Sequence, residues 1–214
     1  MDSKTIEDLA VEKINHILLQ TEQIDTSDIK SNDKTPSWDG SITLYKSHSR
    51  KKNNIYGKAN IQIKGHEVKA NELAKESIKE RVNVSDLKNY RREGGVLYFI
   101  VKLAGTEHFS IYCLELLPMI IEKLLIGKKQ QETITIKVEK LNCAKERLVD
   151  LIGRFIYNSH HQYSFFQENK HHPIPEDLSQ LNGPFILSPL QEIYKGPAFL
   201  YQKRDGFLLS LIHI

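Results

Sequence analysis

The chain has 214 residues, which is enough for one good-sized domain and the start of a second. Hydrophobic residues make up 40% of the chain and charged residues 27%, a mixture typical of globular proteins that excludes a largely disordered chain. The net charge of +3 permits a polyanionic partner without requiring one.

Membrane insertion and secretion are not indicated by the sequence. No apolar run approaches the roughly 20 residues that a membrane-spanning helix needs. The N-terminal segment MDSKTIEDLAVEKI contains acidic residues and no continuous apolar core, so it does not resemble a secretory signal. Cys113 and Cys143 lie in apolar-patterned segments without metal-ligand spacing, which indicates buried, reduced thiols. We therefore expect a cytoplasmic protein with no membrane partner.

The first predicted helix covers about residues 5–20. Counted from Glu7, the apolar residues at helical spacing form one stripe: Ala10, Val11, Ile14 and Leu18. Glu7 is expected at the head of this inward stripe, where an acidic side chain needs a partner or a function.

Two strands are predicted next, over residues 38–47 and 56–68. They are separated by KSHSRKKNN, a basic and polar segment suited to a hairpin tip. Within the second strand, Gln62 and Lys64 share one face because successive side chains alternate.

The remaining elements up to residue 159 follow from periodicity and from helix and turn signals. The run VLYFIVKLA is apolar throughout, as in a strand buried on both faces, and HFSIYCLEL is its expected hairpin partner. Strands are predicted over 96–104, 108–116 and 132–141, and helices over 69–81, 85–92, 118–127 and 144–159.

The composition changes after residue 157. The chain becomes polar, with two pairs of histidines and two prolines, and the histidines lack the cysteines of a typical zinc site. We predict a first domain over 1–157, a linker over 158–182 and an incomplete β-rich unit over 183–214, whose remaining C-terminal part is missing from this chain. The last six residues, LSLIHI, resemble a translated sequencing-library adapter and are left out of the fold prediction.

Four residues supply the groups that metal-dependent phosphodiester cleavage requires. Oxygen ligands hold Mg²⁺, and a nearby lysine positions water and offsets developing negative charge. The order along the chain is Glu7, Asp39, Gln62 and Lys64. Asp39 precedes glycine and also suits a turn, and Glu7 also complements the dipole of its helix.

The D-G-x-I sequence at 39–42 followed by Q-I-K at 62–64 resembles the PD-(D/E)xK nuclease superfamily. The segment NYRREGGVLYFIV and an N-terminal helix with glutamate are similar to the branch called domain of unknown function 4365. The resemblance covers roughly residues 5–155.

This resemblance implies an α/β fold of restriction-endonuclease-like architecture, with a mixed central sheet flanked by helices. It also implies an enzyme that hydrolyses DNA with Mg²⁺ or Mn²⁺, often in defence against foreign DNA. By position, Asp39 and Gln62 become metal ligands with Glu7 as an additional ligand, and Lys64 becomes the catalytic lysine. Many nucleases of this fold cut both strands as dimers, so a homodimer is one expectation, although the sequence reveals no dimer face.

The departure from the family pattern is Gln62, which stands where a carboxylate is commoner. Mrr-like restriction enzymes are similar in using Q-x-K, so the change need not abolish activity. Because a negative charge is lost, weaker metal affinity is expected.

Basic residues in two segments are candidates for contact with DNA phosphates. They are Arg50, Lys51 and Lys52 of the hairpin tip, and Arg91 and Arg92 after Tyr90. Hairpin tips are also commonly charged for solubility alone.

Two other functions stay open from the sequence. One is a catalytically degenerate module of the same fold that binds nucleic acid or a protein, which the glutamine at position 62 favours. The other is a structural N-terminal domain that serves the missing C-terminal part.

Overall fold

A computed structural model describes residues 1–29, 38–128, 130–168, 185–187, 199–204 and 207–213. Its main feature is a seven-stranded mixed sheet in the order β1-β2-β3-β5-β6-β7-β4, in which β3 and β5 are parallel and the other neighbours antiparallel. The strands are β1 (Ile24–Asp25), β2 (Gly40–Tyr45), β3 (Ile55–Glu67), β4 (Ser77–Asn83), β5 (Val96–Ala104), β6 (His108–Leu116) and β7 (Thr133–Lys140).

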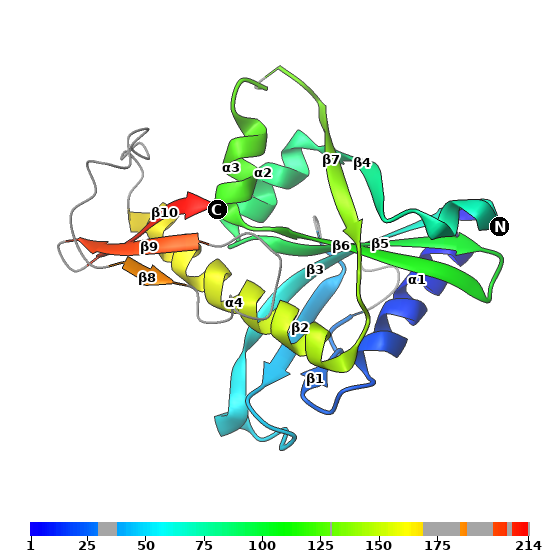
Figure 1. Ribbon diagram of the computed structural model, residues 1–214, viewed down its shortest axis with the longest axis horizontal. Coiled ribbons are helices and arrows are strands. Elements are labelled where there is room, and N and C mark those ends of the chain that lie inside the picture. The colour runs from blue at the N-terminus through cyan, green and yellow to red at the C-terminus, as the bar shows by residue number, and fades with distance from the viewer. Residues whose placement is uncertain (30–37, 129, 169–184, 188–198, 205–206, 214) are drawn as a thin grey trace.

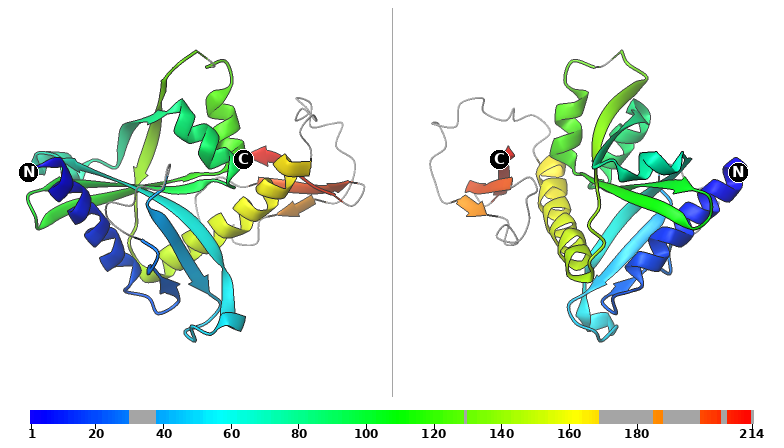
Figure 2. Two further views of the ribbon diagram at one scale, coloured as in Figure 1. Left: turned by 180° about the vertical axis from the view of Figure 1, so that it is seen from behind. Right: turned by 45° about the vertical axis from the view of Figure 1, so that its right-hand side comes forward.

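Helices lie on both faces of this sheet, so the protein is a mixed α/β structure (Figures 1 and 2). The helices are α1 (Ser3–Leu18), α2 (Val84–Arg92), α3 (Pro118–Leu125) and α4 (Lys145–Glu168), with 3-10 turns η1 (Lys52–Asn54) and η2 (Ala70–Ala74). Helices α1 and α4 cover one face, and α2 and α3 cover the other.

The face under α1 and α4 holds the larger hydrophobic core. Ile61 and Ile63 of β3 pack there with Ala10 of α1 and Phe155 of α4. The helix α1 crosses β3 closely at Gly65, where a Cβ atom would lie 2.7 Å from a backbone oxygen of α1. The odd-numbered residues of this part of β3 therefore face α1, and the even-numbered ones face the other way.

The opposite face is covered by α2, α3 and the ribbon formed by β4 and β7. Only the C-terminal end of β7, at Glu139 and Lys140, pairs with β6, so the ribbon leaves the plane of the sheet (Figure 1). Buried residues of the ribbon, such as Val82, pack against Tyr90 of α2 and Tyr98 of β5. The side chain of Gln62 faces this second core.

The predicted strands over 96–104 and 108–116 are confirmed, including their hairpin pairing. The predicted helix over 69–81 is wrong, because this segment forms η2 and then β4. Ile78 and Val82 both pack into the second core while β4 pairs with β7 along its whole length. Tertiary pairing thus overrides a local composition that favours a helix.

Helix α4 continues through the predicted domain boundary after residue 157 and ends at Glu168. Its polar residues Asn158 and Gln162 are fully buried, and Gln162 accepts a hydrogen bond from the Met119 amide at the start of α3. Asn158 and Gln162, within the polar sequence after residue 157, therefore belong to a packed face of this helix. Residues 169–182 of the predicted linker lie outside the described residues.

A separate three-stranded antiparallel sheet lies beside the C-terminal part of α4 (Figure 1). It consists of β8 (Phe185–Leu187), β9 (Phe199–Arg204) and β10 (Phe207–His213). Within the described residues, no helix combines the length and apolar character needed to cross a membrane.

Candidate functional site

Asp39 and Gln62 lie in direct contact although they are far apart in the sequence. Asp39 immediately precedes β2, and its amide donates to the carbonyl of Ile61, which aligns it with β3. Gln62 Nε2 donates to Asp39 Oδ2 at 2.6 Å, and the amide of Ile63 donates to the same oxygen at 2.7 Å. Two N–H donors on one oxygen stabilise the ionised carboxylate.

Tyr90 contacts Gln62 from α2, which covers this face of the sheet. Its hydroxyl donates to Gln62 Oε1 at 3.3 Å, while Gln62 is 5% exposed and Tyr90 2% exposed. Burial, together with the charges of Asp86 and Asp39, raises the pKa of the Tyr90 phenol, so this phenol stays protonated and can donate. The result is a continuous chain of hydrogen bonds from Tyr90 through Gln62 to Asp39.

Lys64 lies on the same face of β3 as Gln62, but it is solvent-exposed. Both residues pair in register with second-core residues of β5, namely Tyr98 and Ile100. Two residues along a strand correspond to about 7 Å, so the ammonium group can reach the surroundings of Asp39 by side-chain rotation.

The next even-numbered residue of β3, His66, contacts Glu80 of β4. His66 Nε2 lies 3.0 Å from Glu80 Oε2, and the Glu80 side chain is 13% exposed. This pair extends the polar row Gln62, Lys64 and His66 along the strand. The sequence pattern does not predict this contact, because the composition of residues 69–81 favours a helix and Glu80 lies instead on β4.

Glu7 is not brought into the cluster. It is solvent-exposed on α1, which covers the opposite face of the sheet from the Gln62 side chain. Its expected place on the inward stripe is wrong, since the buried residues of α1 begin at Ala10. Its assignment as an additional metal ligand stays a prediction.

A divalent cation at Asp39 and Gln62 would need an oxygen atom from each side chain. Two oxygen ligands of one Mg²⁺, each at about 2.1 Å from the metal, lie about 3 Å apart when they occupy adjacent octahedral positions. The 2.6 Å contact between Asp39 and Gln62 is close to that separation, but Gln62 presents a nitrogen to the carboxylate. As placed, the contact is a hydrogen bond, and the pair would offer two oxygens to a cation only after a half-turn of the Gln62 amide.

Within the described residues, no group of three or more histidine, cysteine, aspartate or glutamate side chains is arranged to hold a metal ion. Comparisons with protein-family models, curated proteins and solved structures found no match.

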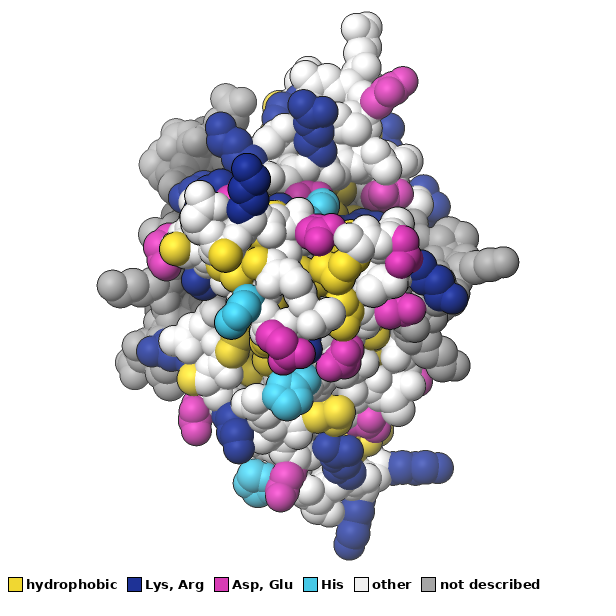
Figure 3. All heavy atoms as spheres, turned by 90° about the vertical axis from the view of Figure 1, so that its right-hand side faces the viewer, with side chains coloured by type: hydrophobic (Ala, Val, Ile, Leu, Met, Phe, Trp, Pro, Cys, Tyr) yellow, Lys and Arg dark blue, Asp and Glu magenta, His cyan; other side chains and the backbone are white. Residues whose placement is uncertain are grey.

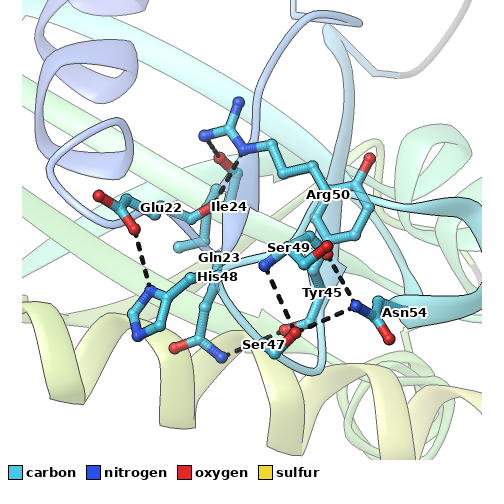
Figure 4. Close-up of polar contacts among 9 residues, drawn as sticks. All are labelled: Glu22, Gln23, Ile24, Tyr45, Ser47, His48, Ser49, Arg50 and Asn54. Atoms are coloured by element: carbon cyan, nitrogen blue, oxygen red, sulfur yellow. Dashed lines mark hydrogen bonds and ion pairs between the residues drawn. The ribbon is translucent and has the colours of Figure 1, made fainter.

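Arg50, predicted to contact DNA, is part of the structure of the hairpin tip (Figure 4). Its guanidinium donates to the carbonyl oxygens of Glu22 and Ile24, at 2.9 and 2.8 Å. The tip is further held by Asn54, whose side-chain amide donates to the Ser47 hydroxyl at 3.1 Å. These contacts attach the tip to β1 and to the segment before it, and they engage Nε and one terminal nitrogen of the Arg50 guanidinium. Contact of Arg50 with DNA stays a prediction.

The other predicted DNA-contacting residues are divided between exposed and paired side chains. Lys51, Lys52 and Arg92 are solvent-exposed, whereas Arg91 forms an ion pair with Glu122 of α3. The face shown in Figure 3 carries acidic and basic side chains together, with small hydrophobic patches between them. The hairpin tip therefore carries exposed basic groups, but the face shown in Figure 3 is not uniformly basic.

A groove of about 470 Å³ lies between the segment before β1, the hairpin tip and α4. Its lining carries both signs of charge, including Asp150 and Lys145, and two of its lining residues are in contact, with His48 Nδ1 3.3 Å from a carboxylate oxygen of Glu22 (Figure 4). None of the predicted catalytic or metal-ligating residues lines this groove.

Proposed function

We propose that this protein is a metal-dependent nuclease of restriction-endonuclease-like architecture that hydrolyses phosphodiester bonds in DNA. The single observation that carries the proposal is the contact between Asp39 and Gln62, with Lys64 on the same strand face. The D-G-x-I and Q-I-K segments that resemble the nuclease superfamily thus lie next to each other in space.

Mg²⁺ or Mn²⁺, when bound, would polarise the scissile phosphate and lower the pKa of water. Asp39 supplies the carboxylate oxygen, and the Gln62 carbonyl supplies a neutral oxygen. The ammonium of Lys64, which is exposed on the same strand face as Gln62, binds a phosphate oxygen and offsets the negative charge that develops as the bond breaks. Lys51 and Lys52 of the hairpin tip add attraction for the DNA backbone.

The test is cleavage of a supercoiled plasmid with and without Mg²⁺ or Mn²⁺, using the full chain. Lys64→Ala is expected to lower the cleavage rate at least ~100-fold, as removal of a group that stabilises developing charge does elsewhere. Lys137→Ala is the matched control, because Lys137 is also an exposed strand lysine but forms an ion pair with Glu139 on β7, a strand that neighbours β6 and β4 and neither β2 nor β3. Full cleavage by Lys64→Ala would remove this lysine from the mechanism.

The second candidate is a non-catalytic module of the same fold that binds nucleic acid or a partner protein. It is favoured by the orientation of the Gln62 amide, whose N–H group already satisfies Asp39 Oδ2. For this candidate, DNA affinity persists in EDTA and falls with salt, and no cleavage occurs with either metal.

A further inference from the structure

The two ends of the Gln62 amide have opposite hydrogen-bonding capacity. Its Nε2 can only donate and its Oε1 can only accept, whereas the hydroxyl of Tyr90 can do both. In the structure, the hydroxyl donates to Oε1 and Nε2 donates to Asp39, so the acceptor end of the amide faces away from the carboxylate. A metal ligand at Gln62 needs the reverse orientation.

The reverse orientation is reached by a half-turn about the last side-chain bond. Oε1 would then lie beside Asp39 Oδ2, and two oxygens at about the observed 2.6 Å repel each other unless a cation lies between them. Nε2 would point at Tyr90, whose hydroxyl can rotate and accept from it. The hydroxyl therefore satisfies the buried amide in both orientations.

We propose that Tyr90 is the positioning residue of this site, because its hydroxyl sets which end of the Gln62 amide faces Asp39. It donates to Oε1 when Asp39 is held by the amide, and it accepts from Nε2 when Asp39 and Oε1 hold a divalent cation. This inference rests on the proposed metal-dependent function. It assigns a role to the tyrosine of the NYRREGGVLYFIV segment, for which the sequence alone indicates no function.

Burial makes the role of Tyr90 specific. Tyr90 is 2% exposed, and its ring packs against Tyr98 with centroids 6.5 Å apart and an interplanar angle of 60°. This part of the second core excludes water. Without the Tyr90 hydroxyl, no water molecule can therefore replace it as the hydrogen-bond partner of the Gln62 amide. An unpaired buried N–H is less well tolerated than an under-satisfied carbonyl. Removal of the hydroxyl therefore disfavours the cation-binding orientation more than the one observed.

The experiment combines calorimetry of Mg²⁺ binding with NMR of the Gln62 side-chain amide, on the full chain with an uncleavable DNA duplex. Gln62→Glu identifies the amide signals. In the wild type, saturation with Mg²⁺ is expected to shift both Nε2 proton signals, because the proton bonded to the carboxylate moves to a phenol oxygen. Tyr90→Phe is expected to bind Mg²⁺ about tenfold more weakly.

Tyr98→Phe is the matched control, since it removes the same atom from a neighbouring tyrosine of the same buried cluster. It is expected to bind Mg²⁺ as the wild type does. If Tyr90→Phe does not fold, the wild-type amide signals decide by themselves.

Two negative results have different meanings. Mg²⁺ binding that needs Asp39, combined with unmoved Gln62 signals or unchanged affinity in Tyr90→Phe, overturns the role of Tyr90 and leaves the proposed nuclease intact. No Mg²⁺ binding by the wild type in the presence of the duplex overturns both.

Discussion

Two carboxylates are held on opposite faces of the central sheet, and they have different kinds of partner. Glu115 of β6 pairs with the cationic guanidinium of Arg154 on α4, with side-chain exposures of 8% and 4%. Asp39 receives hydrogen bonds from the neutral side-chain amide of Gln62 and from a backbone N–H. The first pair joins two opposite charges within the protein, whereas the two hydrogen bonds to Asp39 come from neutral donors.

The difference indicates what each pair is suited to do. A buried ion pair that neutralises itself holds α4 in place and has nothing to offer a ligand. An amide can exchange its N–H for its carbonyl oxygen by a half-turn, which an ion pair cannot do. In the proposed function the Asp39 pair binds a cation, whereas the Glu115 pair has a structural role.

The largest expected effect on stability comes from replacing one member of the Glu115–Arg154 ion pair. Arg154→Met leaves Glu115 buried without its counter-charge and should lower the free energy of unfolding by about 3–5 kcal/mol at pH 7. Replacing both partners, by Glu115→Leu with Arg154→Met, should restore stability to within about 1 kcal/mol of the wild type. Urea unfolding of the three proteins measures this, and an equally unstable double variant would contradict the assignment.

The same variant has a predicted pH dependence. Burial already raises the pKa of Glu115 above its ordinary value of 4.5 although Arg154 opposes the shift, and loss of Arg154 raises this pKa further. An acid with a raised pKa in the folded state contributes stability below its unfolded value, and this contribution is lost as pH rises. The difference in the free energy of unfolding between Arg154→Met and the wild type should therefore increase from about pH 4 to pH 7.

A smaller loss of stability is expected when a second carboxylate is placed beside Asp39. Gln62→Glu places a second carboxylate beside Asp39 and should lower stability by about 2 kcal/mol in EDTA, because one of the two must take up a proton. Millimolar Mg²⁺ should recover this loss and raise the melting temperature of the variant more than that of the wild type. Thermal unfolding in EDTA and in Mg²⁺ tests this. A variant indifferent to Mg²⁺ would mean that no cation is held there.

The smallest effect on stability is expected from Asp39→Asn without metal. The side-chain carbonyl of the introduced asparagine can still accept from the Ile63 amide, so a change of about 1 kcal/mol or less is predicted. Glu115→Gln, the matched change in the other pair, should cost more because it removes the anionic partner of the buried Arg154 guanidinium. Urea unfolding compares the two variants, and equal losses would remove the distinction between the pairs.

The sequence was sufficient for those elements whose pattern and packing agree. The strands over 96–104 and 108–116 carry apolar runs that local pattern and tertiary burial both favour. The contact between Asp39 and Gln62 followed from motif order, because adjacent antiparallel strands bring the two segments together. Here local and long-range interactions favour one structure.

Other features depend on contacts that no local pattern encodes. The segment 69–81 has helical composition, but β4 forms because β7, about 55 residues later, provides its hydrogen bonds. Tyr90 contacts Gln62 across a separation of 28 residues, and the Arg50 guanidinium folds back onto Glu22 and Ile24. Side chains that look available in the sequence are engaged once the chain folds.

The most direct test of the account is calorimetric titration of the full chain with Mg²⁺ and Mn²⁺, with an uncleavable duplex, for the wild type and Asp39→Asn. We predict binding by the wild type and a loss of at least about tenfold in affinity in Asp39→Asn, with the fold retained. Absence of binding by the wild type at millimolar metal, or equal binding by both proteins, would contradict a cation site at Asp39 and Gln62.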